Sequence, residues 1–331
     1  MYFVTGGAGY IGSHCALELL KQGYEVTVFD NLSTGHAETC NILKSFGGSK
    51  FNFIKGDLLK PDDINNALKA KPEAIIHFAA FSQVGESVKE PAKYYENNVI
   101  GSLNLLNAMK KNEVRKIVFS STAAIYGEPI EVPISETHPK NPINTYGKTK
   151  LMIENIMDDF DLAYGIKSVR LRYFNVAGAD SNSLIGEWHN PETHLIPNIL
   201  KSTFGKDFQL KIFGTDYNTK DGTCVRDYIN IEDLVSAHIL ALNYLENGGE
   251  TNFFNLGTKE GSSVTEVLNT CREVTEKNIE AEYTERRAGD PACLIADNSK
   301  AKKILNWTPK KTLKDSIKTA YNWEKKLQTI I

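Results

Sequence analysis

The first half of the chain alternates short apolar runs with longer segments of helical periodicity, and this alternation limits the possible folds most strongly. Several runs, such as residues 75–78 (Ile-Ile-His-Phe), are nearly continuous, which is typical of parallel strands covered by helices on both faces. The expected fold class is therefore α/β, with a doubly wound parallel sheet. The predicted strands are Tyr2–Thr5, Val26–Asp30, Phe51–Gly56, Ala74–Ala80, Lys116–Ser120 and Ser168–Tyr173, and the predicted helices are Ile11–Gln22, Tyr94–Lys110 and Tyr146–Tyr164.

The regular alternation ends at about Val176, where glycine, proline and asparagine become frequent. We predict a first domain over residues 1–176, to which residues 228–257 return as one more helix (Ile231–Asn247) and strand (Thr251–Leu256). Residues 177–331 then form a smaller, mixed α/β domain, in which Ser263 and Glu266 make a capping box at a helix start. Two domains agree with a length of 331 residues, at roughly 150 residues per domain.

Composition excludes several classes of partner. With 38 Lys+Arg against 41 Asp+Glu, no basic field suggests nucleic-acid binding, and no apolar stretch of about 18 residues suggests a membrane span. The N-terminus lacks the pattern of a signal peptide. The five cysteines are widely spaced and contain no CxxC, so we expect free thiols in a cytoplasmic protein rather than disulfides or a zinc site. The seven histidines show no ligand spacing, so no metal is predicted.

A glycine-rich turn joins the first predicted strand to the first helix, with Gly6, Gly9 and Gly12 three residues apart. Such glycines let the backbone approach a pyrophosphate, whose charge the helix N-terminus attracts. Asp30 ends the second strand, where its carboxylate can accept from both ribose hydroxyls and repels a 2′-phosphate. The pattern predicts a Rossmann-like domain that binds NAD. Asp57, after the third strand, either contacts the adenine or is an ordinary turn residue.

A tyrosine and a lysine four residues apart, Tyr146 and Lys150, share one face at the start of a predicted helix. A free phenol has a pKa of about 10, and a nearby ammonium and a positive nicotinamide ring both favour the phenolate. Thr122 follows an apolar strand and can relay a proton to Tyr146 or hydrogen-bond a substrate hydroxyl. The same spacing recurs at residues 321–325, which we interpret as a surface feature because no strand-end hydroxyl precedes it.

The Gly6-x-x-Gly9-x-x-Gly12 spacing resembles the extended short-chain dehydrogenase/reductase superfamily. Further motifs narrow the resemblance to the UDP-glucose 4-epimerase family, from residue 1 to about Trp307. These motifs are Gly6–His14, Asp30–Leu32, His77–Ala80, Val84–Ser87, Tyr94–Asn98, Leu171–Asn175, Asp221–Thr223, Arg226–Tyr228 and Asn255–Gly257.

The resemblance implies an NAD-dependent isomerase that keeps its NAD tightly bound and interconverts UDP-galactose and UDP-glucose. Tyr146 would take the proton of the sugar 4-hydroxyl while hydride leaves C4. The 4-keto sugar would then turn over and receive the hydride on its other face. The resemblance also implies a homodimer, formed through the helices around Tyr94–Lys110 and Tyr146–Tyr164.

The resemblance further implies which residues contact each ligand, with catalytic roles for Tyr146, Lys150 and Thr122. The cofactor contacts are Gly6, Gly9, Tyr10, Ile11, Gly12, Asp30, Asn31, Ser33, Thr34, Gly35, Asp57, Leu58, Phe78, Ala79, Ser82, Asn97, Thr122, Tyr146, Lys150 and Phe174. The UDP-sugar contacts, mostly in the smaller nucleotide-sugar-binding domain, are Thr122, Tyr146, Asn175, His194, Leu195, Lys211, Ile212, Phe213, Arg226, Arg287, Asp290 and Leu294.

Some of these residues have specific expected roles. Arg226 and Arg287 suit a diphosphate because guanidinium groups match phosphate oxygens, although each can also be a solvated surface arginine. Phe213 is expected to stack on the uracil. Ser82 stands where relatives often carry lysine, which removes one cofactor contact. Leu294 aligns with a residue that walls the sugar pocket, and because it is smaller than tyrosine it suggests activity on N-acetylated UDP-sugars; ordinary core packing is the alternative.

Three other functions fit the same fold. A nucleotide-sugar 4,6-dehydratase needs an extra acid/base pair after the strand-end threonine, where this chain has Ala123 and Ala124. A nucleotide-sugar decarboxylase needs residues that bind the 6-carboxylate of the sugar, and the sequence indicates none for this role. A catalytically inactive nucleotide-binding regulator would not need Tyr146, Lys150 and Thr122.

Overall fold

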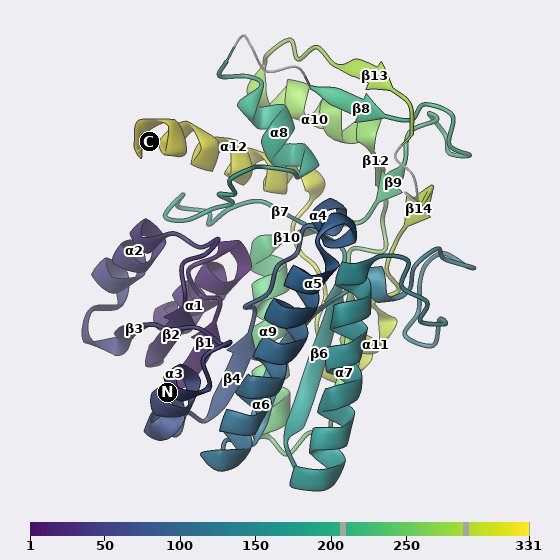
Figure 1. The fold of residues 1–331 in the computed structure, drawn as a ribbon. Helices are drawn as coiled ribbons and strands as arrows, with labels where there is room; N and C mark the ends of the chain where they lie inside the picture. The colour runs from purple at the N-terminus through teal and green to yellow at the C-terminus, as the bar shows by residue number, and fades with distance from the viewer. Residues whose placement is uncertain (206–209, 287–290, 331) are drawn as a thin grey trace. The chain divides into compact units, whose positions relative to one another are not determined.

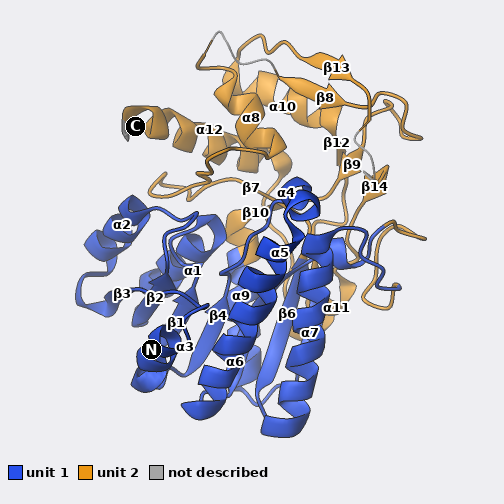
Figure 2. Ribbon diagram, in the orientation of Figure 1, with its two compact units in different colours: residues 1–127, 139–172, 235–254 blue, residues 128–138, 173–234, 255–331 orange. Residues whose placement is uncertain are grey.

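The computed structural model describes residues 1–205, 210–286 and 291–330 and divides them into two compact units (Figure 2). The first unit comprises residues 1–127, 139–172 and 235–254, and the second comprises residues 128–138, 173–234 and 255–331. Residues 128–138 and 173–176 group with the second unit although the sequence assigned them to the first domain. Of the predicted returning residues 228–257, only 235–254 group with the first unit. No helix among the described residues combines the length and apolarity needed to cross a membrane.

A seven-stranded sheet forms the centre of the first unit, with strand order β11-β6-β5-β4-β1-β2-β3 (Figure 1). The pairs β1–β2, β1–β4, β2–β3 and β4–β5 are parallel. This confirms the predicted doubly wound sheet, in which the strand order reverses between β1 and β4. The strands are β1 (Tyr2–Thr5), β2 (Val26–Asp30), β3 (Phe51–Lys55), β4 (Ala74–His77), β5 (Lys116–Thr122), β6 (Lys167–Tyr173) and β11 (Asn252–Leu256).

Helices flank this sheet in layers. Helix α3 packs against α6, which packs against α7, while α1 packs against α2. Buried side chains such as Phe3, Ile75, Leu105 and Ile153 join strands and helices into one apolar core. The helices are α1 (Tyr10–Lys21), α2 (Ala37–Gly47), α3 (Pro61–Ala67), α4 (Val84–Lys89), α5 (Pro91–Tyr94), α6 (Gly101–Lys111), α7 (Thr145–Tyr164) and α9 (Ile231–Glu246), with a π-helical turn (Tyr95–Ile100) between α5 and α6.

Small sheets and helices make up the second unit. Strands β7 and β10 pair in parallel, β8 pairs with β13, and β9 lies between β12 and β14. The predicted capping box is confirmed, because the Ser263 hydroxyl accepts from the Glu266 amide and the Glu266 carboxylate accepts from the Ser263 amide. The elements are β7 (Asn175–Ala177), β8 (Lys211–Phe213), β9 (Val225–Arg226), β10 (Tyr228–Asn230), β12 (Ser262–Ser263), β13 (Glu282–Thr284), β14 (Cys293–Leu294), α8 (Leu195–Lys201), α10 (Val264–Thr275), α11 (Ser299–Leu305) and α12 (Leu313–Ile330).

Two smaller expectations have different outcomes. All five cysteines are free thiols, as predicted. The second Tyr-x-x-x-Lys pattern is not a surface feature, because Tyr321 is buried in the apolar core of the second unit. The amphipathic period of α12 turns this tyrosine inward, while Lys325 lies over its ring with the ammonium 4.0 Å from the centroid.

Candidate functional site

The glycine-rich turn after β1 leaves no room for a side chain at Gly6 or Gly12. Gly6 has φ +70°, and a Cβ added there would lie 2.5 Å from the Ala79 nitrogen. A Cβ on Gly12 would lie 2.3 Å from the Gly6 carbonyl oxygen, so α1 packs directly on the turn. Helix α1 begins at Tyr10, and no side chain caps its first amides. The turn therefore offers a bare backbone cradle with helix N–H groups, which fits a pyrophosphate.

Asp30 stands at the end of β2 beside this turn. Its carboxylate accepts hydrogen bonds from the amides of Ala8 (3.0 Å) and Leu32 (2.8 Å). Burial raises the pKa of Asp30, and these two backbone bonds partly offset that rise. Since a carboxylate has about four acceptor positions, two positions are left after these bonds for ribose hydroxyls.

The loop after β2 folds over the glycine-rich turn. The His36 amide donates to the Ala8 carbonyl (3.2 Å), and a Cβ on Gly35 would lie 2.7 Å from that of Ala8. Asn31 at the start of this loop donates to the Asp57 carboxylate (3.3 Å), so these two predicted cofactor residues lie side by side. The other two predicted residues of the loop, Ser33 and Thr34, are exposed.

The other predicted cofactor residues differ in burial and in the unit to which they belong. Leu58 buries its side chain in the core of the first unit. Phe78 and Ala79 follow β4 and are half-buried, whereas Ser82 is exposed. Asn97 is half-buried and donates to its neighbour Asn98. Phe174 belongs to the second unit, where it is buried between β6 and β7.

The three predicted catalytic residues come together in the first unit. Thr122 ends β5, and its hydroxyl hydrogen-bonds the Tyr146 phenol. Helix α7 begins one residue before Tyr146 because the Asn144 side chain caps it by accepting from the Gly147 amide (2.8 Å). Lys150 lies one turn later, with its ammonium 5.8 Å from the centre of the Tyr146 ring.

Lys150 is almost completely buried, and its ammonium donates to the Ser120 carbonyl (2.8 Å). An ammonium has three donors, so two more are available beyond this bond, as holding the two hydroxyls of a ribose requires. Burial lowers the pKa of Lys150 to about 7, although the charge of Glu154 acts in the opposite direction.

The predicted acidity of Tyr146 is not found in the chain by itself. Burial raises the pKa of Tyr146 to about 12, and only the hydrogen bond from Thr122 lowers it. In this balance desolvation disfavours the phenolate more than the neighbouring side chains favour it, and the expected contribution of the nicotinamide ring is not part of it.

We expect Lys150→Met to raise the free energy of unfolding near neutral pH and to abolish most catalytic turnover. Between pH 7 and 10.5 the unfolded chain holds a proton on Lys150 that the folded chain releases, so the wild type gains stability as pH rises. The variant lacks this dependence. The difference in unfolding free energy, wild type minus variant, should rise by up to about 1.4 kcal/mol per pH unit. Denaturant titrations of nucleotide-free protein at pH 7, 8 and 9 measure it, and a flat difference contradicts the lowered pKa.

A buried charge network supports the catalytic helix, and the sequence analysis missed it. Glu154, one turn after Lys150, accepts from the Arg172 guanidinium (2.9 Å to Nε) and from the Ser121 hydroxyl (2.6 Å). Arg172 also donates to the Tyr126 hydroxyl (2.9 Å) and lies over the Phe253 ring at 4.1 Å. The signal was the position of Glu154 four residues after Lys150, on the same face of a helix.

Two further polar residues hold the segment after β4 against α7. The Ser87 hydroxyl accepts from the Tyr146 amide (3.1 Å). Asn98 is completely buried, bonds the backbone of Phe81 in both directions (2.8 and 3.0 Å) and donates to Thr149 (3.2 Å). Asn98 belongs to the motif Tyr94–Asn98, on which the family resemblance partly rests. Only its neighbour Asn97 was predicted to contact the cofactor.

The predicted substrate residues other than Thr122 and Tyr146 lie in the second unit or outside the described residues. Arg226 in β9 and Leu294 in β14 are register partners on neighbouring parallel strands. Asn175 is exposed in β7, and Leu195 begins α8. On β8, Lys211 is exposed and Phe213 half-buried, but the Ile212 side chain is packed in the core, which leaves only its backbone to meet a ligand. Arg287 and Asp290 lie outside the described residues.

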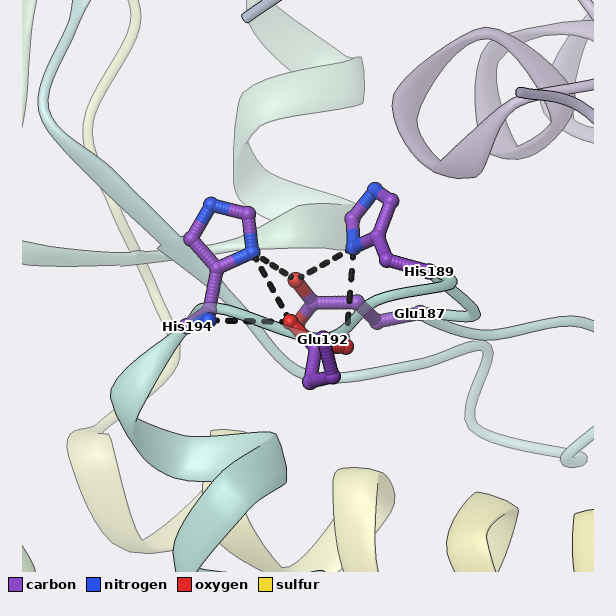
Figure 3. Close-up of side chains that lie close together, drawn as sticks. All are labelled: Glu187, His189, Glu192 and His194. Atoms are coloured by element: carbon purple, nitrogen blue, oxygen red, sulfur yellow. Dashed lines mark hydrogen bonds and ion pairs between the residues drawn. The ribbon is translucent and has the colours of Figure 1, made fainter. Parts of the chain in front are cut away.

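His194 belongs to a cluster that the sequence did not predict (Figure 3). This His–Glu cluster consists of Glu187, His189, Glu192 and His194, in the loop that leads into α8. Nδ1 of His194 lies 2.7 Å from Glu187 Oε1 and 3.3 Å from Glu192 Oε1. Nδ1 of His189 lies 3.3 Å from Glu187 Oε1 and 3.6 Å from Glu192 Oε2.

The carboxylates of the His–Glu cluster control the protonation of its imidazoles. Burial works against the charged form of each histidine, yet the facing carboxylates raise the pKa of His189 to about 9 and that of His194 to about 10. The cluster therefore holds two imidazolium and two carboxylate groups at neutral pH, with no net charge.

Comparisons with known proteins place this geometry in a family. A family model described as GDP-mannose 4,6 dehydratase matches residues 3–320. A UDP-glucose 4-epimerase of Halalkalibacterium halodurans is 50% identical over 97% of this chain and 95% of its own. The chain belongs to the UDP-glucose 4-epimerase family.

Solved structures of this epimerase family have the same fold. The structure from Bifidobacterium longum, in complex with NAD⁺ and UDP, matches with a TM-score of 0.95 and 36% identity, over 100% of this chain and 99% of that one. A UDP-Glc/GlcNAc 4-epimerase of Campylobacter jejuni matches with a TM-score of 0.85 and 42% identity, over 98% and 99%. The family resemblance inferred from the glycine spacing and the Tyr146 region is confirmed.

Proposed function

We propose that this chain is a UDP-glucose 4-epimerase that interconverts UDP-galactose and UDP-glucose with a tightly bound NAD. The observation that carries the proposal is the joint position of Thr122, Tyr146 and Lys150 in a chain 50% identical to a curated epimerase over nearly its full length. The first unit would bind NAD and the second the nucleotide of the substrate.

The residues of the first unit fit NAD. The cradle at Gly6 and Gly12 would hold the pyrophosphate, Asp30 the adenosine ribose and Lys150 the nicotinamide ribose. When bound, NAD⁺ accepts a hydride from the sugar and returns it, and its ring supplies positive charge. That charge addresses the difficulty of the raised Tyr146 pKa, because it favours phenolate in a buried site.

Tyr146 would act as the general base and acid. Its phenolate removes the proton of the sugar 4-hydroxyl as C4 loses hydride, which leaves a 4-keto sugar and a neutral phenol. The phenol returns the proton when hydride comes back to the opposite face of C4, so the reaction is redox-neutral overall. Thr122, already bonded to the phenol, would hold the substrate hydroxyl or pass its proton on.

The second unit would hold the nucleotide diphosphate firmly and the sugar loosely, so that the sugar can rotate. We assign the diphosphate to Arg226, whose guanidinium suits phosphate oxygens, with Arg287 as a second contact. Phe213 and the backbone of Ile212 would flank the uracil beside Lys211. Asn175, His194, Leu195 and Asp290 are assigned to the sugar and phosphates by the family resemblance alone.

A coupled assay without added cofactor tests this function. The protein as purified should convert UDP-galactose to UDP-glucose, because the hydride returns to the sugar and no NAD is consumed. If the products instead contain a dehydrated or decarboxylated sugar, another reaction of the same fold is the correct one. If no product forms even with added NAD, the proposed interconversion of UDP-galactose and UDP-glucose is wrong.

A 4,6-dehydratase is the second candidate, because the matching family model carries that description. Elimination of water needs an acid and a base beyond the oxidation step. The residues that directly follow Thr122 are Ala123 and Ala124, in a 3₁₀ turn where Ala124 donates its amide to the Thr122 hydroxyl (3.1 Å). Methyl groups cannot transfer protons, which favours epimerisation.

We expect measurable activity on UDP-N-acetylglucosamine and UDP-N-acetylgalactosamine. Leu294, beside Arg226 in the register, is smaller than tyrosine and would leave room for an acetamido group. The Campylobacter jejuni protein named as a UDP-Glc/GlcNAc 4-epimerase is 42% identical to this chain. Turnover of both substrate pairs by the wild type and by Leu294→Tyr measures the effect. The variant should lose the acetamido pair selectively, and equal losses on both pairs contradict the assignment.

We propose a homodimer formed through the π-turn–α6 region and α7. Ile100 and Met152 on these elements are 49% and 43% exposed, so each element presents a large apolar side chain that a second copy could cover. Light scattering at micromolar concentration should give about twice the 36.9 kDa chain mass, and Met152→Glu should reduce it. A wild type that stays monomeric excludes the dimer. The free thiols support our assignment to a reducing compartment, the cytoplasm.

A further inference from the structure

The four side chains of the His–Glu cluster are spaced as metal ligands are. One ligand atom from each residue can be chosen so that all four lie within 4.8 Å of one another. In a tetrahedral zinc site with bonds of about 2.0–2.1 Å, neighbouring ligand atoms are about 3.3 Å apart. Here the nitrogens of His194 and His189 lie 2.7 and 3.3 Å from Glu187 Oε1, and 3.3 and 3.6 Å from Oε1 and Oε2 of Glu192, respectively. We propose that the His–Glu cluster binds one Zn²⁺ ion.

The donor types favour zinc over other common divalent cations. Two imidazole nitrogens and two carboxylate oxygens form a mixed set that Zn²⁺ accepts at four-coordinate geometry. Mg²⁺ and Ca²⁺ prefer six or more oxygen ligands, and the two imidazole nitrogens of this cluster are poor ligands for them. Helix α12 carries a further buried carboxylate, Glu324, whose pKa is raised mainly by burial and also by the charges of Glu192 and Glu187.

The surroundings of the cluster orient its carboxylates and leave a path for the ion. The Glu192 carboxylate accepts from the amides of Thr193 (2.8 Å) and His194 (2.9 Å), and the Glu187 carbonyl accepts from the Trp323 indole (2.9 Å). Such outer bonds fix the ligands of metal sites. The His194 side chain is 49% exposed, so an ion can enter from solvent.

The charges of the ligands suit a divalent cation. Two carboxylates and two neutral imidazoles around one divalent cation form a site with no net charge. The Lys201 ammonium, 3.9 Å from Glu192 Oε2, opposes the ion and should keep the affinity moderate.

Zinc would connect the loop residues 187 and 189 to the first turn of α8. His194 would bind the ion through Nδ1. Its Nε2, on the opposite side of the ring, would not bind the ion and could contact the substrate. The same residue can therefore serve both the ion and the substrate contact assigned above. Zinc binding does not require epimerase activity, so the two proposals can fail separately.

Zinc binding to the full chain can be measured directly. Protein treated with a chelator and desalted is titrated with ZnCl₂ by calorimetry, alongside the double variant Glu187→Gln/His189→Gln. Cys293→Ser is the matched control, because Cys293 is the one cysteine that is partly accessible and could bind zinc adventitiously. We expect one ion per chain for the wild type and the control, and at least about tenfold weaker binding for the double variant.

A cobalt spectrum makes the test independent of how well the variants fold. Co²⁺ added to the wild type should give the intense visible bands of a tetrahedral site without the near-ultraviolet band of thiolate coordination. MgCl₂ in excess should not displace it. Absence of zinc binding by the wild type, unchanged binding by the double variant, or an octahedral or thiolate spectrum would each overturn the proposal.

Discussion

Replacing Tyr146 by phenylalanine should leave NAD bound but reduce the turnover of UDP-galactose by about 10²–10⁴-fold. The ring remains to fill its place at the start of α7, and only the oxygen that exchanges the proton with the sugar is lost. The hydrogen bond with Thr122 disappears at the same time. The measurements are the steady-state rate and the amount of nucleotide released when the purified variant is denatured.

The second Tyr-x-x-x-Lys pattern supplies a matched control for this variant. Tyr321→Phe removes the same atom from the same sequence spacing, in the core of the second unit. We expect its turnover to stay within about twofold of the wild type, since no proton transfer is assigned to it. Equal losses in the two variants, or an unchanged rate in Tyr146→Phe, would remove Tyr146 from the mechanism.

The main sheet was predictable because its strands are nearly continuous apolar runs. The ends of β1 and β2 agree with the sequence-based bounds, and β6 and β11 differ by one residue. The strand predicted at Ala74–Ala80 ends at His77 instead. There the chain leaves β4 so that Ala79 can pack against the backbone of Gly6, an approach that hydrophobic pattern alone does not encode.

The π-helical turn before α6 could not be predicted from the sequence. The helix expected over Tyr94–Lys110 contains a π-helical turn at Tyr95–Ile100. This turn carries Asn98, whose side chain bonds the backbone of Phe81. Helical periodicity averages over several turns, so one wider turn leaves it unchanged. The signal that remained was a polar asparagine on an otherwise buried helix face.

The electrostatics of the site depend on burial, which spacing does not reveal. The sequence placed Lys150 next to Tyr146 and predicted an acidic phenol, but in the chain by itself burial raises the pKa of Tyr146 to about 12 and lowers that of Lys150 to about 7. Likewise, the histidines show no ligand spacing along the chain. The loop before α8 nevertheless brings His189 and His194 to the same two carboxylates.

Replacing Glu154 by glutamine should lower the free energy of unfolding by about 3–5 kcal/mol, the typical effect of removing one partner from a buried ion pair. Glu154 and Arg172 are both completely buried, and the amide cannot balance the guanidinium charge left behind. Lys150 would also lose the one charge that raises its pKa, so activity should decline at a lower pH than in the wild type. Denaturant unfolding and the pH dependence of kcat/KM measure the two effects.

A second ion pair between α7 and β6 shows how far the effect depends on the burial of the carboxylate. Asp158 pairs with Arg170 at 2.7 Å, and its side chain is 57% exposed while that of Arg170 is 3% exposed. Arg170 keeps a hydrogen bond to the Glu154 carbonyl (3.0 Å), so Asp158→Asn should destabilise the chain less than Glu154→Gln does. Replacing both buried partners, as Glu154→Gln with Arg172→Met, should recover part of the stability because no unpaired charge remains. If Glu154→Gln destabilises no more than Asp158→Asn, the buried pair does not hold α7 in place. The position of Tyr146 and Lys150 must then depend on Asn144, Ser87 and Asn98, the other residues that fix α7.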